Sequence, residues 1–171
     1  MVTSSNSWTS VAVSEPVALV PLEVTAAFME DESAALLRCA SRWGWAIEID
    51  VDDLVIKFRM SHPADGTPLV LDADLTSYRA IPPAWRFVDD SGSSTPDSFP
   101  APGEKSIFHS NLVICAPWNR LAYKELGGPH DGDWVGPTNW LNITNVTRAV
   151  TLPDMAAIVR AHLHASPGMM A

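Results

Sequence analysis

The amino-acid sequence predicts an α+β protein in which a helix precedes a run of short strands and a second helix closes the chain. Three observations favour this class: an apolar pattern of helical period near the N-terminus, alternating apolar runs directly after it, and a second helical pattern near the C-terminus. The length of 171 residues suffices for one domain with a substantial core. We expect a single domain over residues 21–171, preceded by a tail or edge segment over residues 1–20.

The first helix is predicted to begin near Val24 and to end before Gly44, a helix stop signal. Its apolar positions recur at helical spacing: Met29, Leu36, Ala40 and Trp43. The charged residues fall largely elsewhere, so the helix is amphipathic, with about five turns. Cys39 lies in this helix and is interpreted as a core residue, because free cysteine behaves as a small apolar side chain.

Four strand-like runs follow the helix, separated by turn-forming residues: Trp45–Val51, Leu54–Met60, Pro68–Leu75 and Ala84–Val88. Alternation in the second run places four apolar side chains on one face: Leu54, Ile56, Phe58 and Met60. One apolar and one polar face are typical of an antiparallel sheet with a single buried side. We therefore expect a four-stranded antiparallel meander packed on the first helix.

The second half of the domain is predicted to be largely irregular. Residues 89–105 are rich in Ser, Pro, Gly and Asp without any period and indicate a long surface loop. Asn119–Leu126 is interpreted as a short helix closed by Gly127 and Gly128. A C-terminal helix begins after Thr151, which has the character of an N-cap, and ends at Pro167-Gly168.

Charge and cysteine content exclude several classes of function. The formal net charge of −9 opposes binding to phosphate backbones, so no nucleic-acid partner is expected. The longest apolar runs are far too short to span a bilayer, so no membrane association is expected. With only Cys39 and Cys115 and no secretory signal, the chain is expected in a reducing cytoplasm.

Cys115 is the best candidate for chemistry, because it ends an apolar run and is preceded by His109 and Asn111. The alternative is that it fills space as a buried small side chain, which is the commonest state of a free cysteine.

The order of these elements resembles the ubiquitin-conjugating (UBC-like) fold over residues 24–165. The segment Tyr78–Phe87 resembles the family signature Tyr-Pro-x-x-Pro-Pro-x-hydrophobic-x-Phe, with Arg79 in place of the first proline. His109-Ser110-Asn111 is similar to the His-Pro-Asn motif, and Ile114-Cys115 matches the hydrophobic residue and active-site cysteine of the family.

Three features depart from the eukaryotic pattern. Ser110 replaces the motif proline, only three residues separate Asn111 from Cys115, and neither residues 119–124 nor the loop with His130 has a counterpart. The chain thus resembles a divergent prokaryotic-type member of the kind found beside ubiquitin-activating-like and deubiquitinase-like proteins.

The resemblance implies an enzyme that uses no cofactor. Cys115 would accept a ubiquitin-like protein as a thioester from an activating enzyme and pass it to an amine, usually a lysine, of a target protein. A cysteine suits this because its thiolate is both a good nucleophile and a good leaving group. Asn111 is the oxyanion donor by motif, or else a turn former, and Asn119 is a second candidate for the donor.

The histidines have two readings each. His109 is expected to order its loop, as the motif histidine does, and the alternative is that it takes protons as a catalytic residue. His130, followed by Asp131 and Asp133, is a candidate to lower the thiol pKa or to deprotonate the incoming amine, and otherwise belongs to a polar loop. Tyr123 flanks the site or packs beneath it, and the seven tryptophans, Trp134 among them, are interpreted as core and loop anchors.

Three other classes remain as alternatives. A non-catalytic UBC-like adaptor would bind a ubiquitin-like protein or an activating enzyme without using Cys115. A zinc site would use His109, Cys115 and His130, although their spacing holds no two ligands locally. A papain-type hydrolase is disfavoured because its cysteine would open a helix, whereas Pro117 follows Cys115 by two residues.

Overall fold

The computed structural model describes residues 19–130, 134, 136–144 and 148–171, so the predicted N-terminal tail lies almost wholly outside the described residues. The main elements are two helices, α1 (Leu22–Trp43) and α2 (Leu152–Ala165), and six strands: β1 (Ala46–Asp50), β2 (Val55–Ser61), β3 (Pro68–Asp74), β4 (Ala84–Val88), β5 (Phe108–His109) and β6 (Val113–Ile114). Four short 3₁₀ helices lie in the irregular parts: η1 (Pro96–Ser98), η2 (Arg120–Ala122), η3 (Lys124–Leu126) and η4 (Pro137–Asn142). The α+β class is confirmed.

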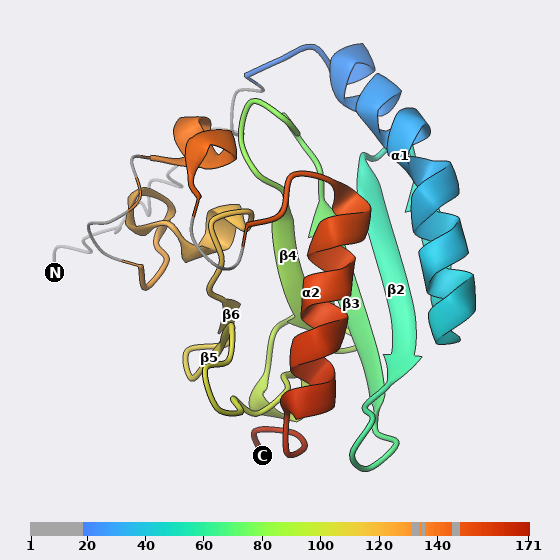
Figure 1. Ribbon diagram of the computed structural model, residues 1–171, viewed down its shortest axis with the longest axis vertical. Coiled ribbons are helices and arrows are strands. Elements are labelled where there is room, and N and C mark those ends of the chain that lie inside the picture. The colour runs from blue at the N-terminus through green and yellow to red at the C-terminus, as the bar shows by residue number, and fades with distance from the viewer. Residues whose placement is uncertain (1–18, 131–133, 135, 145–147) are drawn as a thin grey trace, which may run out of the picture.

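The four-stranded sheet is the antiparallel meander that the sequence predicts, in the order β1-β2-β3-β4. The two helices pack against each other, and α2 crosses β3 and β4 (Figure 1). The β5–β6 hairpin and the 3₁₀ helices lie in an irregular segment, of which β6 and η2 contact β4 at the edge of the sheet. Among the described residues, no helix has the length and apolarity needed to cross a bilayer.

Alternation along β2 gives the sheet one buried and one polar face. Leu54, Ile56, Phe58 and Met60 are each no more than 7% exposed, which confirms the predicted face. Side chains of the opposite face form a row of alternating charge through paired positions on neighbouring strands: Glu48, Lys57, Asp72 and Arg86. Unlike charges on adjacent strands attract, and Lys57 Nζ lies 3.8 Å from Asp72 Oδ1.

Helix α1 begins two residues before the predicted start, after Pro21, and ends as predicted at Gly44. Gly44 adopts a left-handed backbone with φ of 74°, which a residue without Cβ adopts at little cost. The buried residues of the helix are Thr25, Met29, Leu36 and Ala40. The predicted apolar stripe therefore faces the core, with Trp43 at its edge.

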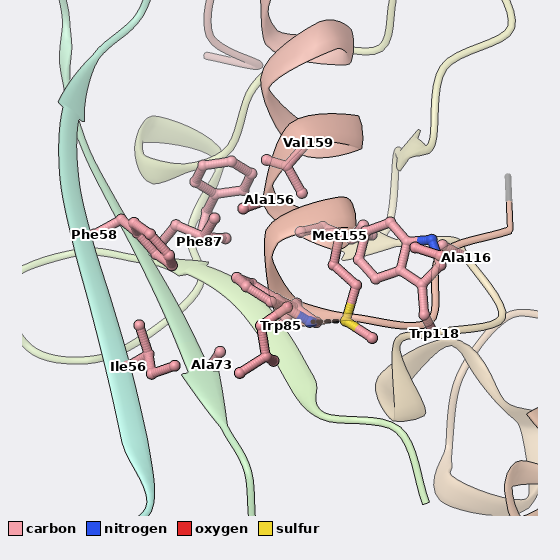
Figure 2. Packing of buried hydrophobic residues seen from close by; sticks show 14 of the residues in the cluster. Ile56, Phe58, Ala73, Trp85, Phe87, Ala116, Trp118, Met155, Ala156 and Val159 are labelled. Carbon is pink, nitrogen blue, oxygen red and sulfur yellow. Dashed lines mark hydrogen bonds between the residues drawn. The ribbon is translucent and has the colours of Figure 1, made fainter. Parts of the chain in front are cut away.

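Trp85 of β4 connects the sheet to the irregular segment and to α2 (Figure 2). Its ring stacks on Phe58 at 6.0 Å and meets Trp118 edge-on at 6.3 Å. Its indole N–H donates to Met155 Sδ at 3.3 Å. Because Trp118 follows Cys115 by three residues, this contact fixes the chain beyond the cysteine against the core.

A partly buried carboxylate joins α1 to the start of α2. Thr151 caps α2 as predicted, since its hydroxyl accepts from the backbone N–H of Asp154. Glu32 of α1 accepts from the backbone N–H of Leu152 at 2.6 Å and from the hydroxyl of Tyr78 at 3.1 Å. Burial raises the pKa of Glu32, while these hydrogen bonds act in the opposite direction. Tyr78 of the Tyr-x-x-x-Pro-Pro segment therefore has a structural role.

The prediction of a surface loop over residues 89–105 is wrong at its centre. Phe99 is fully buried and packs edge-on against Phe87 at 5.7 Å and Phe108 at 6.0 Å. Its carbonyl accepts from the backbone N–H of Met170. The lack of periodicity concealed this anchor, because a single aromatic residue buried by distant partners leaves no repeating pattern.

His62, directly after β2, is expected to make folding sensitive to acid. Its Nδ1 accepts from the backbone N–H of Ala64, so Nε2 carries the proton and donates to Ser166 Oγ at 3.1 Å. Burial lowers the pKa of His62 below 6.5, and nearby Asp65 offsets this only in part. As the pH falls, His62 therefore takes up its proton more readily in the unfolded chain than in the folded chain. The free energy of unfolding decreases as the pH drops below about 6.5.

Urea unfolding of the wild type and His62→Gln at pH 7.5 and 5.0 measures this effect. We expect the wild type to lose more free energy of unfolding than the variant, by at most about 1.4 kcal/mol per pH unit. Equal losses in the two proteins would contradict the assignment.

Candidate active site around Cys115

A short hairpin presents Cys115. Strands β5 and β6 pair with Phe108 opposite Ile114 and His109 opposite Val113, and the N–H of Cys115 continues the ladder to the carbonyl of Ile107 at 2.6 Å. Cys115 is half-buried at the base of the hairpin. Its backbone is fixed by β pairing, so the position of its side chain is set by the hairpin.

His109 and Asn111 lie at the tip of this hairpin. Both are exposed, and His109 Nδ1 lies 2.6 Å from Asn111 Oδ1. This contact agrees with the expectation that His109 orders the loop. Asn111 and Cys115 lie at opposite ends of β6, and the hydrogen bonds of the Asn111 side chain stay within the tip.

Asn119 is fully buried and binds the backbone on both sides of the cysteine segment. Its Oδ1 accepts from the backbone N–H groups of Trp85 at 2.9 Å and Leu121 at 3.3 Å. Its Nδ2 donates to the carbonyls of Trp85 at 3.1 Å and Ile114 at 2.8 Å. Both amide hydrogens and both acceptor positions are used, so no N–H remains for an oxyanion. Asn119 is a structural residue that joins β4, β6 and η2.

Arg120 anchors η2 to the end of β3. Its guanidinium binds the carboxylate of Asp74 and the carbonyl of Thr76, each at 2.6 Å. A cavity of about 250 Å³ lies on this side of the segment, lined by Asp74, Thr76, Ser77, Ile81, Arg120, Leu121 and Leu126. The guanidinium is engaged by the protein itself, which holds η2 in place.

The segment Asn119–Leu126 forms two 3₁₀ helices instead of the predicted single helix. Tyr123 between η2 and η3 has an extended backbone, with ψ of 134°, which interrupts the helical hydrogen bonding. Gly127 ends η3 with φ of 86°, as predicted for a glycine at this position. The chain then turns back along η2.

Gly128 allows this return. A Cβ at residue 128 would overlap the carbonyls of Leu121 and Ala122, so only glycine fits. The N–H of Gly128 donates to the carbonyl of Tyr123, and the N–H of His130 donates to the carbonyl of Ala122 at 2.9 Å. These hydrogen bonds place His130 beside Cys115.

The structure brings together Cys115 and His130. His130 Nδ1 lies 3.9 Å from Cys115 Sγ, within reach of an S–H···N hydrogen bond. Burial raises the pKa of the Cys115 thiol, so the sulfur needs a nearby base to react at neutral pH. Asp131 and Asp133, the predicted companions of His130, lie outside the described residues.

Two aromatic residues surround His130. Trp134 stacks on its imidazole, with ring centroids 3.5 Å apart, and Tyr123 contacts Trp134 at 5.0 Å. In the sequence, Trp134 is one of seven tryptophans interpreted as core and loop anchors. The one sequence feature that points to the stacked pair is the spacing of four residues between His130 and Trp134. The seven tryptophans share no period, so this spacing does not stand out.

Within the part of the chain that the structure describes, no three metal-binding side chains gather. Cys115 and His130 meet, whereas His109 lies at the hairpin tip. The zinc alternative thus has only two of its three ligands in one place.

No family model, curated protein or solved structure matches this chain. A half-buried thiol with an imidazole nitrogen at 3.9 Å has the two parts of an activated sulfur nucleophile. Such a pair is suited to acyl transfer through a covalent thioester.

Proposed function

We propose that the protein is a UBC-like carrier that holds a ubiquitin-like protein as a thioester on Cys115 and transfers it to an amine of a target protein. The observation that carries the proposal is the Cys115–His130 contact at 3.9 Å, set in the order of helix, meander, irregular cysteine segment and C-terminal helix. That order is the one the sequence resemblance implies.

The reaction consists of two acyl transfers. In the first, the Cys115 sulfur attacks the C-terminal thioester carbonyl of a ubiquitin-like protein bound to an activating enzyme. His130 takes the thiol proton, a new S–C bond forms, and the departing thiolate of the activating enzyme receives a proton. In the second, a lysine amine attacks the carbonyl, the S–C bond to Cys115 breaks, and the amine proton passes to the released thiolate.

The geometry limits which amide assists the oxyanion. Asn119 is excluded from that role because its two N–H groups already bind carbonyls. Asn111 is the donor by motif, but it lies at the exposed hairpin tip, at the opposite end of β6 from Cys115.

The proposal predicts that Cys115 accepts an acyl group directly from a ubiquitin thioester. The probe is ubiquitin with a C-terminal mercaptoethanesulfonate thioester, incubated with the protein in a Cys39→Ser background. We expect an adduct that thiol reductants cleave, and Cys115→Ser should lower its rate of formation by on the order of 100-fold or give a reductant-stable ester.

Cys115→Ser also serves as the control for acylation of surface lysines, whose amide products resist reductant. An equal amount of adduct in the variant, or none in either protein, would contradict the carrier and favour the non-catalytic adaptor.

A further inference from the structure

The imidazole of His130 lacks the usual orienting hydrogen bond. In Cys–His and Ser–His sites, a third group binds the second ring nitrogen and fixes the ring so that the first nitrogen faces the nucleophile. Here Nδ1 faces Cys115, and Nε2 is buried with no hydrogen-bond partner among the described residues. The ring must be oriented in another way.

Trp134 supplies a flat surface against the imidazole. The ring centroids of His130 and Trp134 lie 3.5 Å apart, and the two planes are inclined by 24°. At this separation the rings are in van der Waals contact over their faces, so the imidazole cannot tilt out of its plane without losing the contact. Stacking restricts the ring without using Nε2.

Tyr123 supports Trp134 and ties it to the cysteine segment. The Tyr123 and Trp134 rings lie 5.0 Å apart, and Tyr123 is only 3% exposed. The Tyr123 hydroxyl donates to the carbonyl of Pro117 at 2.7 Å, and burial raises the pKa of this hydroxyl, which keeps the donor protonated. Pro117 lies two residues beyond Cys115, so the chain that carries the thiol also anchors the aromatic pair.

We propose that Trp134 is the positioning residue of the Cys115–His130 pair and orients the imidazole by stacking, where other sites use a hydrogen bond to the second nitrogen. Tyr123 holds the indole in place. This inference rests on the role of His130 in the proposed function, although it concerns only the reactivity of the thiol and requires neither a ubiquitin-like protein nor an activating enzyme.

The pH profile of Cys115 alkylation by iodoacetamide tests the proposal. The sulfur forms a bond to the methylene carbon, iodide leaves, and the thiol proton passes to His130 or, without it, to water. We expect His130→Ala and Trp134→Leu to lower the rate at pH 7 by on the order of tenfold and to give the same pH profile. Trp134→Phe keeps an aromatic face and should restore most of the rate.

Two controls separate positioning from general damage. Trp43→Leu removes a partly buried tryptophan of a different aromatic pair and should leave the Cys115 rate unchanged. Cys39, resolved by mass spectrometry in the same samples, reports on folding, because its rate rises if α1 loosens. A Trp134→Leu profile that matches the wild type, while His130→Ala is slow, would overturn the proposal.

A slow Trp134→Phe, equal to Trp134→Leu with Cys39 unchanged, would also overturn it. Failure of the carrier function appears differently: the alkylation pattern would hold while ubiquitin thioester gave no adduct.

Discussion

Replacement of Asn119 by alanine is expected to lower the free energy of unfolding by about 3–5 kcal/mol, the largest stability effect that we predict. The side chain makes four hydrogen bonds to three different segments of backbone, three of them buried and the one with Leu121 partly buried. Alanine leaves the N–H and carbonyl of Trp85 without their side-chain partner, and each unsatisfied buried group costs about 1–3 kcal/mol. The same change releases β6 from β4, beside Cys115.

Urea unfolding of Asn119→Ala measures this loss, with Asn142→Ala as the matched control. Asn142 is exposed and its amide binds only Asn139 among the described residues, so its removal should change stability by less than about 0.5 kcal/mol. A loss below about 1 kcal/mol for Asn119→Ala would show that the hydrogen bonds are replaced by water.

Regular elements with a local signal could be predicted from the sequence. The alternation from Leu54 to Met60 identifies the buried face of β2, because side chains in a strand point to opposite sides. Thr151 and Gly44 identify helix ends, because their side chain or backbone conformation satisfies groups that the helix leaves unpaired. Each of these features is decided within a few residues of the chain.

The irregular half could be predicted only in part. Phe99 lies in a stretch rich in polar and turn-forming residues, yet distant residues bury it. Asn119 is the first residue of the predicted helix, and in the structure it caps η2, with its Oδ1 accepting from the backbone N–H of Leu121. Its larger role depends on Trp85, which is 34 positions away, and no local pattern contains that contact.

The candidate site also has one residue with a local sequence signal, Cys115, and one whose position depends on distant contacts, His130. Cys115 was identified by its place after an apolar run, and the structure leaves it half-buried with a histidine alongside. His130 was one of several candidates, since the sequence gives its spacing from Cys115 but not the path of the chain between them. That path depends on the close approach of Gly128 to the backbone of η2. Only backbone atoms take part in this contact, so the side chains of η2 give no sign of it in the sequence.

Gly128→Ala is expected to lower the rate of acyl transfer to Cys115 by on the order of 100-fold, as much as the loss of His130 itself. The new methyl group would overlap the carbonyls of Leu121 and Ala122, so the strand of chain that leads to His130 must move away from η2. The hydrogen bond from His130 to Ala122 breaks, and the imidazole leaves the sulfur.

The ubiquitin-thioester reaction measures this effect, with Gly92→Ala as the control, and iodoacetamide alkylation at pH 7 should slow by about tenfold, as in His130→Ala. A Cβ on Gly92 meets nothing within 4 Å, but the residue has φ of 81°, so alanine there costs about 1 kcal/mol through the backbone alone. If Gly128→Ala folds and reacts within threefold of the wild type, the loop is not what brings His130 to the thiol. A loss confined to Gly128→Ala assigns the reactivity of Cys115 to this single close approach of two backbone segments.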